Sequence, residues 1–512
     1  MLNTTWIKAT AHTFDNGDIP LFVSGSSASS KAGWAAWNTD LTGPLRRVTV
    51  RKMLGEGAGS FQIAAKHYMV GGPHDGRPLA TLIKDGDWIT INAVKNGVES
   101  HLMVGRIDTV GMSVGVSGRG AIEQQVTLSG RDLTAAALDV PVYFNPYDPA
   151  HSNVAGVAMA SILTTFSGRP SAVVPALLLD FLKAGGSFGQ QHMVPAGVWA
   201  KETKTPWAQH IDVESYVQEL RGFVHIPQVL QSPGANPVWQ FARAYQNPTM
   251  NEMWLETRFQ DVEAPRKGYL VFREKPFVNA ADTTYSPWFD LKTHDVPYSR
   301  LTRLSLSKGR DRVNHVMVIG EMPSTMSQDA YFLFPPLVDL DSVGRYGLRR
   351  LEERTPYMAL SDEGGADAFY TESLEWQALV LSWNVLNADY LSGVAGFGEL
   401  APEIRIGQKI ALTGGPPTSY TPSGHTAYPE DLTFYVEGVQ HSWAAGQVPQ
   451  VDTQVLLSRG YAESRRVEAV VGAAQKYTNE LSGASVNVGG IIEVWDDESD
   501  NLAEQMKDQG YT

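Results

Sequence analysis

The chain has 512 residues, which is too long for one hydrophobic core, and it is expected to form three or four domains. Its formal net charge of −14 argues against a protein that wraps nucleic acid, because such proteins carry an excess of Lys and Arg on the contact face. It contains no cysteine, which excludes a disulfide framework and a thiolate zinc site and fits assembly in a reducing cytoplasm.

Residues 1–44 are rich in Gly, Ser and Thr and are expected to form an extended N-terminal arm, which Trp34 and Trp37 anchor. The segment lacks the basic start and apolar stretch of a signal peptide, so none is expected. The longest apolar stretch, 172–182, is too short to cross a bilayer and is interpreted as a buried helix. We therefore expect no stable association with a membrane.

Residues 45–140 are predicted to form a first β domain. Apolar and polar residues alternate in several segments bounded by Gly or Pro, as expected for strands with one buried face. The predicted strands are 45–52, 60–68, 87–94, 102–110 and 124–131.

Residues 141–295 have the mixed periodicity of an α/β domain. Gly168 and Gly185 are placed where the two helices before them need a left-handed cap, and Asn236-Pro237 is a typical helix start. The predicted elements are helices at 155–166, 171–184 and 238–245, and strands within 247–258 and 268–277.

A second, diverged copy of the first β domain is predicted at 296–321 and 399–465. Its leading strand, 301–308, alternates as 45–52 does, and Gly407 opens a short strand as Gly86 does. The closing strand ends in Ser and Arg in both copies. Aligning these residues makes Val126 the equivalent of Val455. From leading strand to Gly is 41 residues in the first copy and 106 in the second, so the second carries an insertion of roughly 65 residues.

This insertion is placed at 322–398 and is predicted to be helical. Apolar residues within 371–391 recur with the spacing of an amphipathic helix, and Gly393 is expected to cap its end. Residues 466–512 become polar and acidic, and they are expected to form a C-terminal acidic arm that contacts a partner.

Patterns that indicate catalysis are weak. Gly111-Met-Ser113-Val-Gly115 matches the nucleophile-elbow pattern, but an elbow needs a helix after it, and here Val116 to Gly120 is a Gly-rich turn that leads to another strand. A hairpin turn is the better interpretation. The thirteen Trp are scattered through predicted helices, strands and loops, which favours packing in cores and interfaces over a sugar-stacking surface.

Patterns that indicate metal or cofactor binding are equally weak. Asp339-Leu-Asp341 begins like a calcium loop, but Val343 and Arg350 occupy its fifth and twelfth positions, so a turn before a helix is expected. No two of the twelve histidines are three or four residues apart, and His441 is interpreted as a satisfied, partly buried residue. We therefore expect no enzyme, no catalytic, cofactor-binding or metal-binding residues, and no cofactor.

Two related β domains in one chain have edges that neighbouring chains can pair with. If three chains meet, six such domains form a ring of near-sixfold symmetry from a threefold assembly. An acidic lining of such a ring would repel phosphate, although the acidic residues serve equally well as an outer surface that keeps the protein soluble.

Five segments, in this order over most of residues 45–465, resemble the baseplate hub proteins of tailed phages. More distantly, they resemble the late control protein D family and the hub part of type VI secretion spikes. The segments are SGRDLTAA (129–136), Asn251-Glu252 with YLVFREKPF (269–277), 303–318 with Asp311 and Asn314, RYGLR (345–349), and 434–463.

The resemblance implies an α+β, mainly β protein, with two homologous tail-tube-like β-barrel domains in one chain and helical or mixed insertion domains. It implies a homotrimeric, pseudo-sixfold ring in the virion, made in the bacterial host cytoplasm. The ring would join a hexameric tail tube or distal tail protein to a trimeric central spike protein, contact tape measure and baseplate wedge proteins, and hold viral DNA only in transit. A virion-associated cell-wall hydrolase and a glycan- or receptor-binding tail protein are the alternatives.

Overall fold

The computed structural model describes residues 5–21, 45–139, 212–217, 237–258, 267–278, 287–320, 332–355, 377–414 and 431–466, with short gaps inside several of these ranges. Several predictions lie outside the described residues: the helices at 155–166 and 171–184, the anchoring role of Trp34 and Trp37, and the acidic arm beyond 466.

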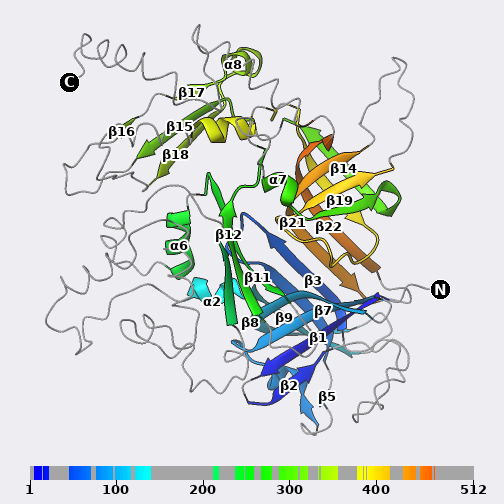
Figure 1. Ribbon diagram of the computed structural model, residues 1–512. Helices are drawn as coiled ribbons and strands as arrows, with labels where there is room; N and C mark the ends of the chain where they lie inside the picture. The colour runs from blue at the N-terminus through cyan, green and yellow to red at the C-terminus, as the bar shows by residue number, and fades with distance from the viewer. Residues whose placement is uncertain are drawn as a thin grey trace, which may run out of the picture.

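The protein is mainly β, and most of its strands join in one 13-stranded sheet (Figure 1). The sheet consists of β1 (Thr5–Thr13), β2 (Gly17–Pro20), β3 (Leu45–Met53), β4 (Ser60–Lys66), β7 (Trp88–Lys95), β8 (Val98–Val116), β9 (Ile122–Asp132), β13 (Thr293–Pro297), β14 (Leu301–Lys308), β19 (Leu391–Phe397), β20 (Lys409–Thr413), β21 (Leu432–Ala444) and β22 (Gln450–Tyr461).

The sheet contains the same five-stranded arrangement twice. In the first unit, hydrogen-bonded neighbours follow the order β3-β4-β9-β8-β7, and in the second unit they follow the order β14-β19-β22-β21-β20. Each strand of one unit corresponds to the strand at the same place in the other, both in the sheet and along the chain. The internal repeat predicted from the sequence is therefore present in the fold.

The two units also share their irregularities. The leading strand of each has a register shift at the same position, after Leu45 in β3 and after Leu301 in β14. The fourth strand has another after Ile107 in β8 and after Val436 in β21. Such bulges bend a strand and increase its twist, so their repetition indicates two copies of one curved sheet.

The sequence match for the last strand of the repeat was wrong by two residues. Val110 of β8 lies opposite Leu128, whereas Val439 at the equivalent place in β21 lies opposite Val455. Leu128, and not Val126, therefore corresponds to Val455. A shift of two keeps the same residues on the buried face, so the alternation alone could not detect it.

Gly86 and Gly407 open the equivalent strands β7 and β20, as predicted. Their backbone φ angles are +89° and +75°, a region that a residue with a Cβ rarely adopts. The Gly86 N–H donates to the carbonyl of Ile107, and the Gly407 N–H donates to the carbonyl of Val436. The turn and its hydrogen bond are thus repeated in both units.

The expected pair of closed β-barrels is not found, because the described strands of both units belong to one open sheet. The first unit continues through β3 into β21 of the second unit and through β7 into β1, so its outer strands pair with other strands instead of with each other. The second unit ends at β14, whose one partner strand in the described part of the chain is β19. Residues within 5–20, expected as part of an arm, contribute β1 and β2 to this sheet.

A smaller, separate sheet connects the two units in the chain and in space (Figure 1). It consists of β10 (Asp212–Val217), β12 (Lys267–Glu274) and β11 (Asn251–Arg258), in that order, and helix α6 (Val238–Gln246) precedes β11. The predicted helix at 238–245 and the strands within 247–258 and 268–277 are confirmed.

The insertion between β14 and β19 is not purely helical. It contains a four-stranded sheet of β15 (His315–Gly320), β16 (Phe332–Leu333), β17 (Leu337–Val338) and β18 (Arg350–Thr355), with helix α8 (Leu340–Tyr346) between the last two. Residues 377–384 are helical, and Leu379, Val380 and Trp383 are buried as predicted. The helix is not amphipathic, however, because Gln377 and Ser382 on its other faces are buried as well.

Gly393 does not cap this helix, contrary to expectation, but lies inside β19. A Cβ at Gly393 would collide with the backbone carbonyl of Ser305 in β14, so this Gly permits the close approach of the two strands.

Short elements complete the described structure: β5 (Met69–Val70), β6 (Arg77–Pro78), α1 (Leu79–Leu82), α2 (Thr134–Asp139), α7 (Pro287–Asp290) and a 3-10 turn at Tyr298–Arg300. Within the described residues, the helices fall short of the length and apolarity needed to cross a membrane.

Candidate functional site

The two units meet where β21 of the second pairs with β3 of the first. The antiparallel pairing runs from Gly438, opposite Met53, to Ala444, opposite Arg47. Backbone hydrogen bonds along this seam make the two units one continuous sheet. We call this pairing the junction.

The junction is apolar on one face. Trp443 of β21 is 3% exposed and packs in the hydrophobic core of the first unit, although it belongs to the second. Its cross-strand partner in β3 is Val48, which is also buried. Leu400, from the loop after β19, enters the same core. Two buried apolar side chains of the second unit, together with the partly buried Ala445 and Val451, thus complete the core of the first.

An ion-pair cluster ties the units together beside the junction. The Glu399 carboxylate accepts hydrogen bonds from Lys95 Nζ of the first unit at 2.6 Å and from Arg300 Nε of the second at 2.7 Å. Burial alone would raise the pKa of Glu399, but the hydrogen bonds from Lys95 and Arg300 outweigh it and lower that pKa. Because these groups are about a quarter to a third exposed, each pair contributes up to about 1 kcal/mol.

His441 lies in β21 opposite Val50 of β3 and is buried. Its Nδ1 is 3.0 Å from Thr453 Oγ1, and this hydroxyl donates to the backbone carbonyl of Glu399. Burial, and then the nearby charge of Arg405, lower the pKa of His441 to about 4. The residue is a neutral, hydrogen-bonded part of the junction, in agreement with its interpretation from the sequence.

His441 should make the protein less stable in mild acid. In the unfolded chain its pKa returns to about 6.5, so between pH 6.5 and 4 the unfolded state binds more protons than the folded state. The contribution of neutral His441 to the free energy of unfolding is complete above pH 6.5. It decreases as the pH falls toward 4, by about 3 kcal/mol in total. The variant His441→Asn should lose less stability than the native chain between pH 7 and pH 4.5, measured as urea midpoints. Parallel pH dependence of the two proteins would contradict this assignment.

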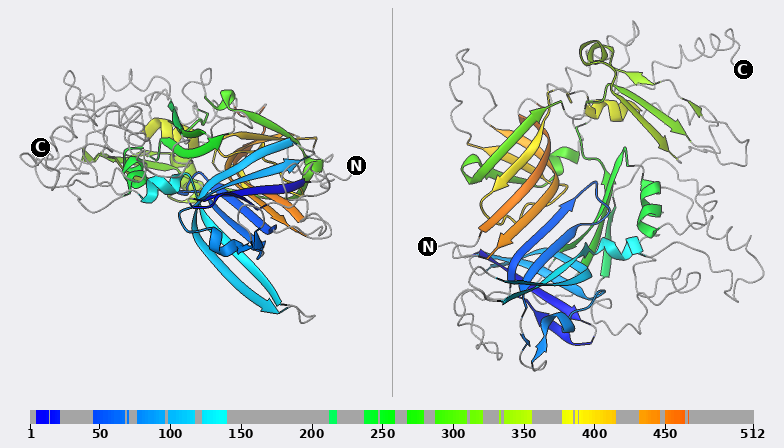
Figure 2. Two further views of the ribbon diagram at one scale, coloured as in Figure 1. Left: turned by 90° about the horizontal axis from the view of Figure 1, so that it is seen from below. Right: turned by 180° about the vertical axis from the view of Figure 1, so that it is seen from behind.

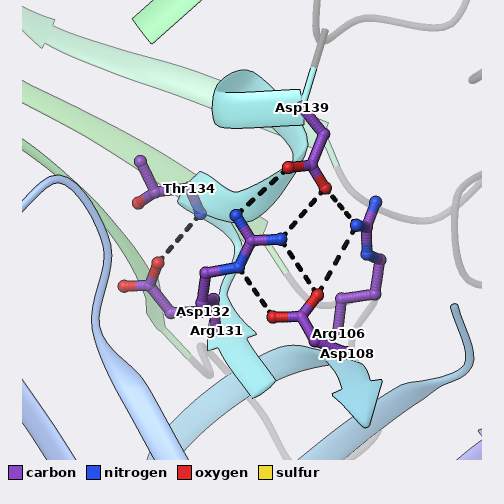
Figure 3. A network of polar contacts seen from close by, with 6 residues as sticks. All are labelled: Arg106, Asp108, Arg131, Asp132, Thr134 and Asp139. Carbon is purple, nitrogen blue, oxygen red and sulfur yellow. Dashed lines mark hydrogen bonds and ion pairs between the residues drawn. The ribbon is translucent and has the colours of Figure 1, made fainter. Parts of the chain in front are cut away.

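A cluster of charges anchors the bulge of β8 to the end of the first unit (Figure 3). Arg131 of β9 donates from Nε and Nη2 to the Asp108 carboxylate at 2.6 and 3.0 Å, and from Nη1 to Asp139 of α2 at 3.1 Å. Arg106 also pairs with Asp139. The hydrogen bonds to Asp108 raise the pKa of Arg131. The network fixes the direction in which β8 leaves the first unit.

Asp132, the next residue of the segment 129–136, has a different role. Its carboxylate accepts from the backbone N–H of Thr134 at 3.0 Å, which starts α2, and from Lys52 Nζ of β3 at 2.8 Å. Lys52 also donates to the carbonyl of Leu255 in β11. This segment therefore connects β3, and through it the junction, to the connecting sheet.

A buried polar triad joins the connecting sheet to the second unit. Arg273 Nε donates to Glu252 Oε1 at 2.6 Å, and the Tyr435 hydroxyl donates to Glu252 Oε2 at 2.6 Å. Arg273 Nη2 also donates to the carbonyl of Gly407 at 2.7 Å, and the guanidinium lies over the ring of Trp254. Burial, and then the charge of Glu252, raise the pKa of Tyr435. The second and fifth segments of the sequence resemblance meet here.

The third and fourth segments meet in the insertion. Asn314 is fully buried, donates from Nδ2 to the carbonyl of Gly347 at 2.9 Å, and accepts from the backbone N–H of Arg349 at 2.7 Å. Asp311 lies outside the described residues. Asn314 therefore holds the RYGLR segment against β15, which is a structural role.

A cavity of about 420 Å³ lies between the connecting sheet and both units. Its walls include Glu56 of the first unit, Arg243 of α6, Glu252 of β11, and Tyr435 and Arg459 of the second unit. Nowhere in the described part of the chain do three or more His, Asp or Glu side chains gather in a way that could hold a metal ion. The cavity lies where three parts of the fold meet.

The two sequence motifs that resemble a nucleophile elbow and a calcium loop both belong to regular secondary structure. Ser113 lies within the continuous strand β8 and is exposed, so no elbow occurs at Gly111–Gly115. The predicted hairpin is present, because β8 and β9 pair antiparallel with Val116 opposite Ile122, while the turn itself, 117–120, lies outside the described residues. Asp339 is the N-cap of α8, where its carboxylate accepts from the backbone N–H of Ser342 at 2.9 Å, as expected for a turn before a helix.

No protein-family model matches this chain, and no curated protein matches it. Among solved structures, it is similar to a tail protein from Neisseria meningitidis MC58 (TM-score 0.42, 12% identity, 89% of this chain and 96% of that chain covered). It is also similar to the 43 kDa tail protein of prophage MuSo2 from Shewanella oneidensis (TM-score 0.43, 10% identity, 91% and 98% covered). A third match is a type VI secretion system component from E. coli (TM-score 0.36, 10% identity, 83% and 76% covered). These three matches extend over 83–91% of this chain.

Proposed function

We propose that this protein is a structural hub at the tip or baseplate of a phage tail, with no enzymatic role of its own. The observation that supports this most is the pair of units with the same strand order and the same bulges, joined edge to edge in one sheet. The sequence resemblance to baseplate hub proteins points to the same role.

In this proposal, three chains form a ring. Each chain contributes two equivalent units, so three chains present six similar units around one axis while the insertions and connecting sheets repeat only three times. One face of the ring would match the sixfold symmetry of a tail tube or distal tail protein. The other face would match the threefold symmetry of a central spike protein.

The ring would allow viral DNA to pass without holding it. The net charge of −14 supports this, because an acidic protein repels phosphate over the roughly 8 Å at which charges act at physiological salt. The protein would then reside in the virion, with tape measure and baseplate wedge proteins as further neighbours.

The oligomeric state tests this function directly. Native mass spectrometry of the purified full chain should give three times the chain mass, and addition of the tail tube and spike proteins of the same phage should give a larger complex. A chain that stays monomeric and binds neither protein would overturn the hub.

A further inference from the structure

The distal half of β8 has an open edge. β7 pairs with β8 only from Val98 to Arg106, while β9 follows β8 on the other side as far as Val116. Along residues 109–116 the edge opposite β9 has no partner strand in the part of the chain that the structure describes. Figure 2 shows the β8–β9 hairpin projecting from the body of the molecule.

This edge displays apolar side chains. Met112 is 61% exposed and Val114 is 59% exposed, so both are among the most exposed large apolar residues that the structure describes. Long edge strands with exposed apolar residues pair readily with other strands, and monomeric proteins usually protect them with charges, Pro or bulges. Residues 109–116 contain none of these charges and no Pro.

β14 provides a second open edge, at the other end of the repeat. It pairs with β19 on one side, and its other side faces no strand within the described ranges. Leu304 and Leu306 of β14 pack against the core of the second unit but remain partly exposed. The equivalent residues of β3, Val48 and Val50, are 1% and 3% exposed.

The junction explains why positions in β21 and β3 are buried while the equivalent positions in β8 and β14 are exposed. His441 and Trp443 of β21 occupy the places that Met112 and Val114 occupy in β8, and they are 7% and 3% exposed because β3 covers them. In the junction, β21 of the second unit pairs with β3 of the first. The equivalent strands, β8 of the first unit and β14 of the second, lack this partner in the described part of the chain.

We propose that residues 110–115 of β8 pair antiparallel with residues 303–308 of β14 in a second copy of this chain, in the register of the junction. This rests on the proposed ring and specifies how its copies join. Transfer of the junction register places Val110 opposite Lys308, Met112 opposite Leu306, Ser113 opposite Ser305, Val114 opposite Leu304, and Gly115 opposite Arg303.

The chemistry of the two edges is complementary in this register. Met112 and Val114 meet Leu306 and Leu304, just as Trp443 meets Val48 in the junction. Val114 would enter the core of the partner's second unit, as Trp443 enters the core of the first. The contact is head to tail, so each copy offers one β8 edge and one β14 edge, and a closed ring leaves neither open.

The absence of cysteine makes this register testable by cross-linking. In the variant Ser113→Cys/Ser305→Cys, every cysteine of the purified full chain faces one from a neighbouring copy at a separation that suits a disulfide. Under mild oxidation, the chain should shift to covalent dimers and circular trimers on a non-reducing gel. The matched control Ser113→Cys/Lys308→Cys places its second cysteine three residues further along the regular part of β14, on the opposite face, and should remain monomeric on the same gel.

A second pair of variants tests the edge without cysteines. Val114→Asp should convert the trimer to a monomer in native mass spectrometry, whereas Val98→Asp should remain a trimer, because Val98 is 67% exposed on the same strand but outside the proposed contact. A trimer that resists Val114→Asp, or that cross-links through the control pair, would overturn this register and leave the hub standing. A native chain that never forms a trimer would overturn both.

Discussion

Replacement of Trp443 by alanine is expected to open the junction while each unit keeps its own fold. The indole is 3% exposed and fills the core of the first unit, so its removal should cost about 3–5 kcal/mol. The loss falls on the contact between β21 and β3, because Trp443 and Leu400 are the buried residues that the second unit contributes to the core of the first. Hydrogen exchange should therefore accelerate at the backbone amides of residues 47–53 and 438–444.

Trp88→Ala is the matched control. Trp88 is 4% exposed and belongs to β7 of the first unit, away from the junction. Its removal should lower stability to a comparable degree, yet leave the amides of β3 and β21 protected relative to their neighbours. If Trp443→Ala and Trp88→Ala gave the same exchange pattern, the two units would unfold as one body, and the junction would not be a separable contact.

The strands that the sequence predicted best are those whose alternation is strict. β14 begins and ends where the pattern 301–308 placed it, and β3 extends one residue beyond 45–52. Gly86 and Gly407 could be located because a left-handed backbone at a strand start strongly favours Gly. Local chemistry decided all of these elements.

The outer part of β8 could not be predicted in the same way. Gly111 and Gly115 have low strand propensity, and the predicted strand ended at Val110, although Met112 and Val114 alternate with small residues as in a strand. The structure extends β8 through this segment because β9 pairs with it along the full length. A long-range pairing overrode the local preference.

The buried triad shows a similar limit. Glu252, Arg273 and Tyr435 were noticed as parts of separate segments, but nothing in those segments indicated that they touch. Glu252 and Tyr435 are separated by 183 residues in the chain, and only the packing of the connecting sheet on the second unit brings them together. Sequence patterns of period two or 3.6 give the buried face of each element and not its partner.

Replacement of Arg273 by methionine should destabilise the contact between the connecting sheet and the second unit by about 3–5 kcal/mol. Methionine retains much of the side-chain volume but leaves the Glu252 carboxylate, which is 8% exposed, with the Tyr435 hydroxyl as its remaining partner in the triad. The Gly407 carbonyl also loses a donor. The urea midpoint of the full chain should fall, and limited proteolysis should cut within 251–274 before it cuts the first unit.

Two further variants separate the loss of charge pairing from a loss of packing. Arg243→Met changes an exposed arginine on the wall of the same cavity and should shift stability by no more than about 0.5 kcal/mol. Arg273→Met combined with Glu252→Gln removes the unpaired charge, so it should be more stable than Arg273→Met alone, since the two residues are directly coupled. If the double variant were less stable by the full sum of the single changes, the salt bridge would not be the source of the stability, and the triad would hold the two parts together through shape alone.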